Sequence, residues 1–304
     1  EAYLSKESAF LFNNLLFTVL TLLIMLGTIF PLLSEAVRGY QVRVGPGYFQ
    51  QTASPLSVML IFLMGLCPLI AWRQASVTSL KRNLTFPFLI TIATTIVLYS
   101  LGVTQLGGMV VSASIGFSLG SILQEFYRAT DPEDSMPLGK RFLTLFSAAK
   151  QHQRRYGGYI IHLSMILIIG GIAGSTFYEN SSMVTLGIDE PFVLGPYTIE
   201  MTDLYSTQEA ERQLYFVLLD IYKGGSKIYE ADPSVAYFFD REMTIRYPWV
   251  KSQGLSDLYL IYESSAEGRA TFTFKIIPQV TLIWVGTILG ILGSIVTIWK
   301  FKRK

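Results

Sequence analysis

The sequence predicts an α-helical polytopic membrane protein, with about six transmembrane helices and an inserted extracytoplasmic all-β domain. Three observations support this fold class. The 304-residue chain is 51% hydrophobic and only 15% charged, whereas an ordinary soluble domain carries about 25% charge. Apolar runs of about 20 residues, long enough to cross a hydrocarbon core about 30 Å thick, recur along the chain. One later region alternates apolar and polar residues over short stretches, which is the period of a strand.

Six apolar runs define the predicted spans, at 10–33, 55–72, 84–103, 107–126, 156–177 and 278–299. The loops 73–83 and 127–155 and the tail 300–304 together hold 13 of the 24 Lys and Arg residues. Threading six spans in order places all three on one side, which the positive-inside rule makes cytoplasmic. The region 178–277 is therefore expected outside the membrane. The predicted localisation is the inner, cytoplasmic membrane, with the β domain in the periplasm or outside.

The predicted domains are residues 1–177 with five spans, the β-rich domain 178–277, and the last span with its basic tail, 278–304. The β-rich region holds 15 of the 22 acidic residues and 8 of the 24 basic ones. Alternation within 197–201, 213–222, 257–262 and 270–276 predicts strands, and Gly224 and Gly225 mark a hairpin turn. We expect six to eight short strands in a small sandwich or barrel.

The segment 44–49, Val-Gly-Pro-Gly-Tyr-Phe, predicts a turn on the outer face just before the second span. Its aromatic residues, Tyr48 and Phe49, would then lie in the membrane interface. On the cytoplasmic side, residues 147–155 predict a short amphipathic helix at the membrane surface.

Composition excludes several classes of function. The single cysteine, Cys67, lies in an apolar run, so an intramolecular disulfide and a metal site of several thiolates are both impossible. No dense basic helix stands outside the membrane loops, which gives no indication of a nucleic-acid partner. The sequence has no phosphate-binding glycine loop, no His-Glu-x-x-His and no Cys-x-x-Cys-His. The last of these means that the chain itself carries no covalently attached c-type haem.

Only two histidines are present, and they differ in setting. His152 lies in the basic loop, where a solvated interfacial residue is the simpler interpretation. His162 lies about two turns inside the fifth span, where an ionisable residue is costly and by default a functional candidate. A neutral imidazole is a common ligand, including an axial ligand to haem iron. An inter-helix hydrogen bond explains His162 equally well.

Glycines surround His162 on the same predicted helix, at 157, 158, 170, 171 and 174. Gly170 and Gly174 form a pair of small residues spaced for close helix contact. The same spacing would admit a flat ligand, although helix packing alone is the simpler interpretation.

Three stretches of the sequence together resemble the CcmF/NrfE family, the haem-lyase subunits of cytochrome c maturation, and the resemblance is to the C-terminal half of that family. The stretches are residues 5–16 with 26–32, residues 44–49 with 55–56 and 64–65, and residues 155–163 with 171–175. With the six spans and the outer domain, the resemblance covers nearly the whole chain.

The resemblance implies a part in attaching haem to apocytochrome c on the outer face of the membrane. It implies that His162 is one axial ligand of a membrane-embedded haem b, which reduces the incoming haem or keeps it reduced. The implied partners are the haem chaperone and other cytochrome c maturation proteins, apocytochrome c and the lipid bilayer, with no nucleic acid.

The sequence departs from the family in one respect. Family members carry a tryptophan-rich WWD segment, with flanking histidines that hold the incoming haem, and this sequence has none. The second axial ligand is also expected from an N-terminal half, or from a partner chain carrying the WWD segment. Because the sequence begins at Glu1, where the resemblance begins, we expect a fragment or a split-gene product. Its status as an enzyme is therefore open: it resembles a subunit or fragment of a haem lyase, without the haem-transfer segment and without catalytic residues that can be named.

Two other functions remain open. The chain could be a non-catalytic scaffold that docks partners through its β domain. It could also be a haem transporter, although no inverted repeat, broken helix or mid-span acidic residue supports that reading.

Overall fold

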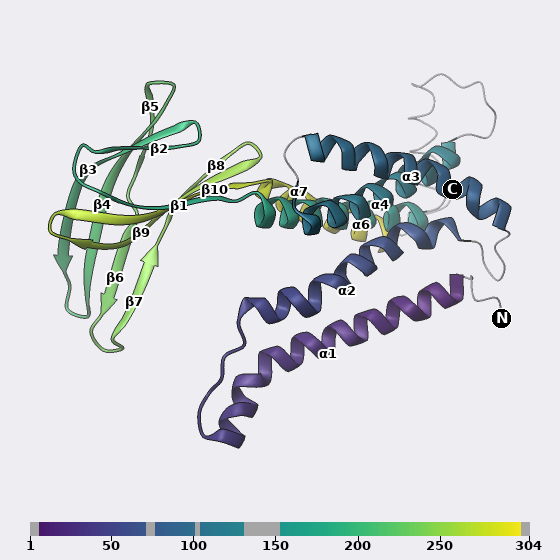
Figure 1. Cartoon of the computed structure of the whole chain (residues 1–304), viewed down its shortest axis with the longest axis horizontal. Helices are drawn as coiled ribbons and strands as arrows, with labels where there is room; N and C mark the ends of the chain where they lie inside the picture. The colour runs from purple at the N-terminus through teal and green to yellow at the C-terminus, as the bar shows by residue number, and fades with distance from the viewer. Residues whose placement is uncertain (1–5, 71–76, 101–103, 131–152, 299–304) are drawn as a thin grey trace. The chain divides into compact units, whose positions relative to one another are not determined.

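The computed structural model describes residues 6–70, 77–100, 104–130 and 153–298, which divide into two compact units. One unit comprises Glu1–Gly170 with Trp284–Lys304, and the other comprises Gly171–Ile283. The helices belong mainly to the first unit and the strands to the second (Figure 1). The sequence-based boundaries at 177/178 and 277/278 describe something else, the separation of membrane spans from an exported domain. That separation stays a prediction.

Six helices in the described part of the chain are long and apolar enough to cross a membrane, as predicted. The chain is thus a multi-pass membrane protein. The helices are α1 (Lys6–Arg38), α2 (Pro46–Leu66), α3 (Val77–Ser100), α4 (Leu106–Thr130), α6 (Gln153–Phe177) and α7 (Val280–Ile298), and a short 3-10 turn, η1 (Cys67–Leu69), follows α2.

The second span begins earlier than predicted, at Pro46 rather than at Pro55. Gly45 is the N-cap of α2 and Pro46 occupies its first turn, where a proline costs nothing because its missing N–H would have no partner. Pro55 lies inside the helix, which membrane helices tolerate. The segment 44–49 is therefore a helix start rather than a free turn.

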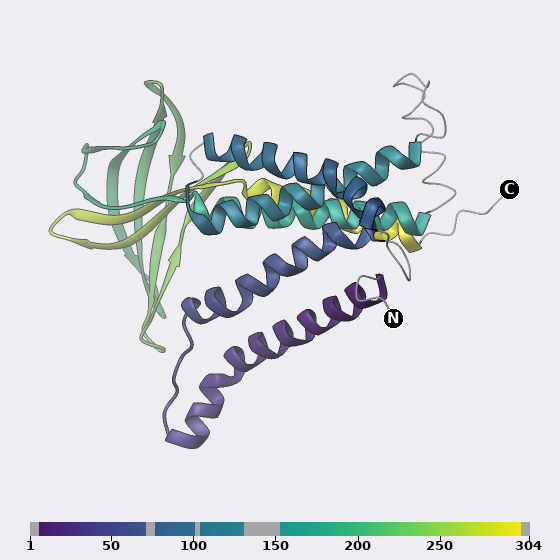
Figure 2. The same cartoon turned by 45° about the vertical axis from the view of Figure 1, so that its right-hand side comes forward.

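Tyr48 and Phe49 pack on α1, and their place in the membrane interface stays a prediction. The Tyr48 hydroxyl donates to the Leu23 carbonyl oxygen at 3.0 Å. A Cβ added at Gly27 would lie 2.9 Å from Phe49, so only glycine admits this ring. The two contacts join α1 to α2, which run side by side in both views (Figure 1, Figure 2).

Hydroxyl groups join α4 to α2. Ser118 and Ser121 of α4 each donate at 2.6 Å, to the carbonyl oxygens of Ile61 and Gly65 respectively. Both serines are fully buried. Helices in lipid lack a hydrophobic drive to associate, and small residues with inter-helix hydrogen bonds supply the attraction instead.

The second unit is all-β, as predicted, but has more strands than the expected six to eight. Ten strands are described: β1 (Asn180–Leu186), β2 (Pro191–Leu194), β3 (Tyr197–Gln208), β4 (Arg212–Lys223), β5 (Ser226–Ala231), β6 (Ser234–Phe238), β7 (Met243–Tyr247), β8 (Trp249–Gln253), β9 (Ser256–Ala266) and β10 (Arg269–Pro278). The count fell short because β2, β6, β7 and β8 have only four or five residues, too few for alternation to mark them.

Two antiparallel sheets share one core. One has the order β1-β10-β9-β8, and the other the order β2-β3-β4-β6-β7 with β5 paired to β4. Side chains from both sheets, such as Leu219 of β4 and Phe272 of β10, are fully buried in this core. The predicted hairpin is confirmed between β4 and β5, where Gly224 and Gly225 have φ of 59° and 81°. Only glycine adopts such angles at little cost.

The second sheet is apolar on its outward face as well. Val217, Leu219 and Ile221 of β4 point into the shared core, so the even-numbered residues of β4 point away from it. The ring of Phe216 stacks on Tyr205 of β3 at 5.2 Å between ring centres. In register on the same face lie Leu214, Ala236, Phe238, Met243, Ile245 and Tyr247.

Candidate functional site

His162, the residue singled out from the sequence, lies on α6 and is half-buried. Its Nδ1 atom is buried and has no hydrogen-bond partner in the described part of the chain. The inter-helix hydrogen bond that would explain this histidine is therefore not formed at Nδ1 with any residue that the structure describes. His152, the other candidate, lies outside the described residues, as does most of the helix predicted at 147–155.

One face of α6 packs closely against α7 through glycines. A Cβ added at Gly286 would lie 2.8 Å from the Ser164 carbonyl oxygen, and one at Gly293 would lie 2.9 Å from Ile160. From the α6 side, a Cβ at Gly157 would lie 2.9 Å from the Gly293 carbonyl oxygen. At Gly157 the structure therefore confirms helix packing, the simpler interpretation of the glycine pattern. Of the predicted pair Gly170 and Gly174, a Cβ at Gly170 would meet nothing within 4 Å, whereas one at Gly174 would lie 2.7 Å from Gln279 Cβ.

Gly158 differs from its neighbour, because a Cβ added there would meet nothing within 4 Å. Gly158 precedes His162 by four residues, so the two lie on the same face of α6. Met165, three residues beyond His162, is 42% exposed. The position one turn before the imidazole thus carries no side chain, and a Cβ there would meet nothing within 4 Å, which leaves room for a flat group.

A buried carboxylate holds the α4-facing side of α6. Glu125 of α4 is only 6% exposed, and its Oε2 accepts hydrogen bonds from Arg155 Nη2 and from the Tyr159 hydroxyl, each at 2.8 Å. Arg155 Nε donates to the Tyr159 hydroxyl oxygen at 2.9 Å. The three side chains form a closed ring of hydrogen bonds, one to two turns before His162.

The ring is extended on the other side of Glu125. Arg128 Nη1 lies 3.5 Å from Glu125 Oε1, and its Nη2 donates to Asn83 Oδ1 of α3 at 2.7 Å. Asn83 in turn donates to the Leu69 carbonyl oxygen at 3.2 Å. We call Glu125, Arg128, Arg155, Tyr159 and Asn83 the Glu125 network; it joins α6, α4, α3 and η1.

Sequence reasoning missed this network. The available signal was an acidic residue near the end of an apolar run, three residues before an arginine, with Arg155 at the start of the next span. That pattern indicates a charge that needs a partner in another helix, but spacing alone does not say which helix.

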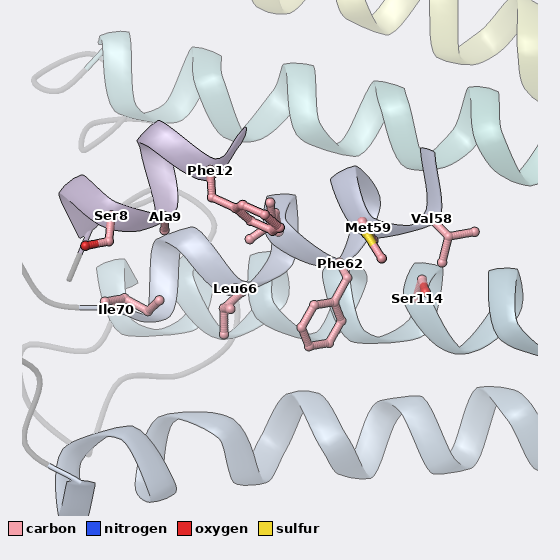
Figure 3. A pocket seen from close by; sticks show the side chains of 10 residues that line it. Ser8, Ala9, Phe12, Val58, Met59, Phe62, Leu66, Ile70 and Ser114 are labelled. Carbon is pink, nitrogen blue, oxygen red and sulfur yellow. The ribbon is translucent and has the colours of Figure 1, made fainter. Parts of the chain in front are cut away.

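An apolar cavity of about 730 Å³ lies elsewhere in the helical unit, between α1, α2 and α4. Phe12, Met59, Phe62 and Leu66 are among its lining residues (Figure 3). Its only polar side chains are those of Ser8 and Ser114. His162 is not among the lining residues, so this cavity is separate from the candidate ligand.

Among the described residues, no group of three or more His, Cys, Asp or Glu side chains could hold a metal ion. Cys67 is half-buried and takes part in no disulfide. His162 therefore stands alone as a candidate ligand in the part of the chain described here, and a two-ligand site would need a second donor.

No protein-family model matches the chain, but individual relatives do. It is 21% identical over 301 residues to "Cytochrome c-type biogenesis protein CycK" of Bradyrhizobium diazoefficiens, covering 98% of this chain and 45% of that protein. It is 22% identical to "Cytochrome c-type biogenesis protein NrfE" of Haemophilus influenzae, covering 99% and 45%. The chain thus spans about half the length of the curated relatives it matches.

A solved structure shows the same fold. The structure is named "Cytochrome c Heme Lyase CcmF" and matches with a TM-score of 0.75 and 22% identity, over 98% of this chain and 46% of that one. This likeness agrees with the six helices and the β unit described above. Over nearly its whole length, this chain is a homologue of the cytochrome c-type biogenesis proteins CycK, NrfE and CcmF.

Proposed function

We propose that this chain is a membrane component of a cytochrome c haem lyase, in which His162 supplies one axial ligand to a haem b. One observation carries the ligand assignment: the Nδ1 atom of His162 is buried without a hydrogen-bond partner among the described residues. Burying a polar atom without a partner costs about 1–3 kcal/mol. That cost is understandable where a ligand or another polypeptide completes the site.

The surroundings of His162 fit a flat, largely apolar cofactor. Gly158 leaves the preceding turn open, and the flanking residues Ile161 and Leu163 are apolar. A histidine-ligated haem supplies one-electron redox chemistry, tuned by its ligands and burial. On this proposal His162 provides one donor, and a second comes from the other half of the relatives' length.

The location and partners follow from the same proposal. Basic residues in the loops and tail favour a cytoplasmic position for those segments, which would place the β unit in the periplasm of a cell with an inner membrane. The partners are then the other half of the lyase, which carries the haem-transfer segment, other cytochrome c maturation proteins including a haem chaperone, and apocytochrome c.

The outward face of the second sheet favours a second candidate function, a docking scaffold. Tyr205 is 45% exposed, Met243 41% and Tyr247 43%, and they flank a row of apolar residues that the shared core does not use. Leu214 and Ala236 within that row are themselves buried, so the exposed apolar surface is formed by the flanking side chains; a cluster of exposed apolar side chains often marks a binding site. On this reading His162 would have no cofactor.

An absorption spectrum separates the two candidates. The chain is co-produced with the polypeptide that supplies the other half of the relatives' length, then purified in its parent form and as His162→Ala. The lyase proposal expects a sharp low-spin b-type spectrum that collapses in His162→Ala. The matched control is His152→Ala, which should keep it. A normal spectrum in His162→Ala removes the ligand assignment, and absence of haem from the parent complex favours the scaffold.

A further inference from the structure

Glu125 lies near the end of the apolar stretch of α4, Leu106–Arg128, and is only 6% exposed. Glu7 and Glu35, the acidic residues of α1, are by contrast exposed. Isolating a carboxylate from water inside a span is costly unless the charge is paired and hydrogen-bonded. Here two arginines and a tyrosine face it. Such a complete set of partners indicates that the charge is retained for a role that an apolar residue could not fill.

The first effect of Glu125 is to fix the rotation of α6 about its own axis. Its Oε2 atom is held by two side chains of α6, Arg155 and Tyr159, which are four residues apart and so lie on one face. These two side chains are also bonded to each other. Rotation of α6 would break both hydrogen bonds to Glu125 together.

The opposite constraint on α6 comes from α7. Gly286 and Gly293 allow the α7 backbone to lie close to α6. A Cβ at Gly286 would lie 2.8 Å from the Ser164 carbonyl oxygen, and one at Gly293 would lie 2.9 Å from the Ile160 side chain. α4 and α7 therefore hold different sides of α6. His162 follows Arg155 by seven residues, about two turns, so it lies at the edge of the α4-facing side, and Gly158, where a Cβ would meet nothing within 4 Å, lies next to it. Tyr159 and His162 are three residues apart and are neighbours on the helix surface.

The second effect of Glu125 is electrostatic. Its carboxylate balances Arg155 and Arg128, at 2.8 and 3.5 Å. Arg155 precedes His162 by seven residues, which is about 10 Å along the helix axis at 1.5 Å per residue. An unbalanced guanidinium at that range would favour a reduced, less positive group beside His162.

We propose that Glu125 is a positioning residue, which fixes the direction of His162 on α6 and balances the arginine charge near it. The inference rests on the proposed haem site at His162. It adds a residue of α4 to that site, acting through Tyr159 and Arg155 rather than by contact with the cofactor.

Two substitutions separate the positioning effect from the charge. Glu125→Gln keeps an oxygen that accepts from Tyr159 and Arg155, but removes the negative charge. Glu125→Ala removes both. In the complex with the other half of the lyase, we expect Glu125→Gln to keep the low-spin haem spectrum and to raise its midpoint potential. Glu125→Ala and Tyr159→Phe should weaken or broaden that spectrum, with Glu35→Gln on α1 as the matched control that changes neither property.

Thermal unfolding in the His162→Ala background gives a readout that needs no haem. There, Glu125→Ala should lower the unfolding temperature more than Glu35→Ala does, and equal effects would overturn the inference.

The spectra of the complex give a second way to overturn the inference. If the parent spectrum depends on His162 but both Glu125 variants keep its shape and midpoint potential, Glu125 is only a brace between helices. A parent spectrum that does not depend on His162 refutes the proposed function instead, and is recognised from the His162→Ala protein alone.

Discussion

Adjacent glycines on α6 have opposite surroundings, although nothing in the sequence distinguishes them. Gly157 faces the α7 backbone, and a side chain there would have to displace it. Gly158 faces open space beside His162. One glycine is thus required by helix packing, whereas no described residue requires a glycine at the other position.

This contrast gives a prediction for two single substitutions. Gly157→Ala should destabilise the helical unit by about 1–3 kcal/mol, the usual cost of adding volume to a packed interface. Gly158→Leu should leave the unfolding temperature unchanged or slightly raised, because leucine favours a helix over glycine by up to about 1 kcal/mol. It should nevertheless abolish the proposed haem spectrum, because the side chain fills the space next to the imidazole.

Unfolding curves and absorption spectra of the two variants check the prediction. A Gly158→Leu protein with a normal His162-dependent spectrum would show that the open turn is not where the cofactor lies.

Strand β4 has apolar side chains on both faces, and the two faces differ in what they stabilise. Leu219 is fully buried in the core shared by the two sheets. Leu218, its neighbour, is 36% exposed on the outward face. An identical substitution at the two positions therefore measures the core and the outward face separately.

We expect Leu219→Ala to cost about 2–5 kcal/mol, from lost burial and the cavity that remains. Leu218→Ala should change the free energy of unfolding by less than about 0.5 kcal/mol, as for an ordinary surface position. Thermal or denaturant unfolding monitored in the β unit provides the measurement. A large loss from Leu218→Ala would mean that the outward face is already covered in the folded protein.

Long helices were predictable from the sequence, and strands of four or five residues were not. Six apolar runs identified six helices, because length and composition suffice for a span. The start of α2 was misplaced because Pro46 and Gly47 are typical of a turn, and only the packing of Tyr48 on α1 shows that the helix has already begun. Strands of four or five residues, such as β2 and β7, are too short to show alternation.

The candidate site was predictable only in part. A histidine inside a span was visible at once, because its chemistry is unusual there. The partners of Glu125 were not, since Glu125 and Tyr159 are 34 residues apart and their contact depends on how α4 and α6 pack. Likewise, the sequence could not distinguish Gly157 from Gly158, because their difference depends on the position of α7.

For the whole molecule, the distribution of charge predicts the orientation in the membrane. The basic residues Lys81 and Arg82 in the first turns of α3 should be cytoplasmic, and the acidic β unit should lie on the opposite side. Single cysteines introduced in a Cys67→Ser background test this: Ser226→Cys at the β4–β5 hairpin and Arg82→Cys at the start of α3, both at exposed positions.

In intact cells or right-side-out vesicles, a membrane-impermeant maleimide should label Ser226→Cys directly. It should label Arg82→Cys only after the membrane is permeabilised. The reverse pattern would invert the predicted orientation, and with it the proposed position of the β unit.

The pairing of β1 with β10 also constrains the order in which the protein can be made. These strands begin and end the β unit, with Asn180 opposite Ile276, and the nearby ion pair of Glu179 with Lys275 joins residues 96 positions apart. The first sheet therefore cannot close until nearly the whole unit has left the ribosome, and α7 follows at once. On the proposed orientation, the segment would cross the membrane with β1 unpaired, and a stall before α7 would leave that edge open to aggregation.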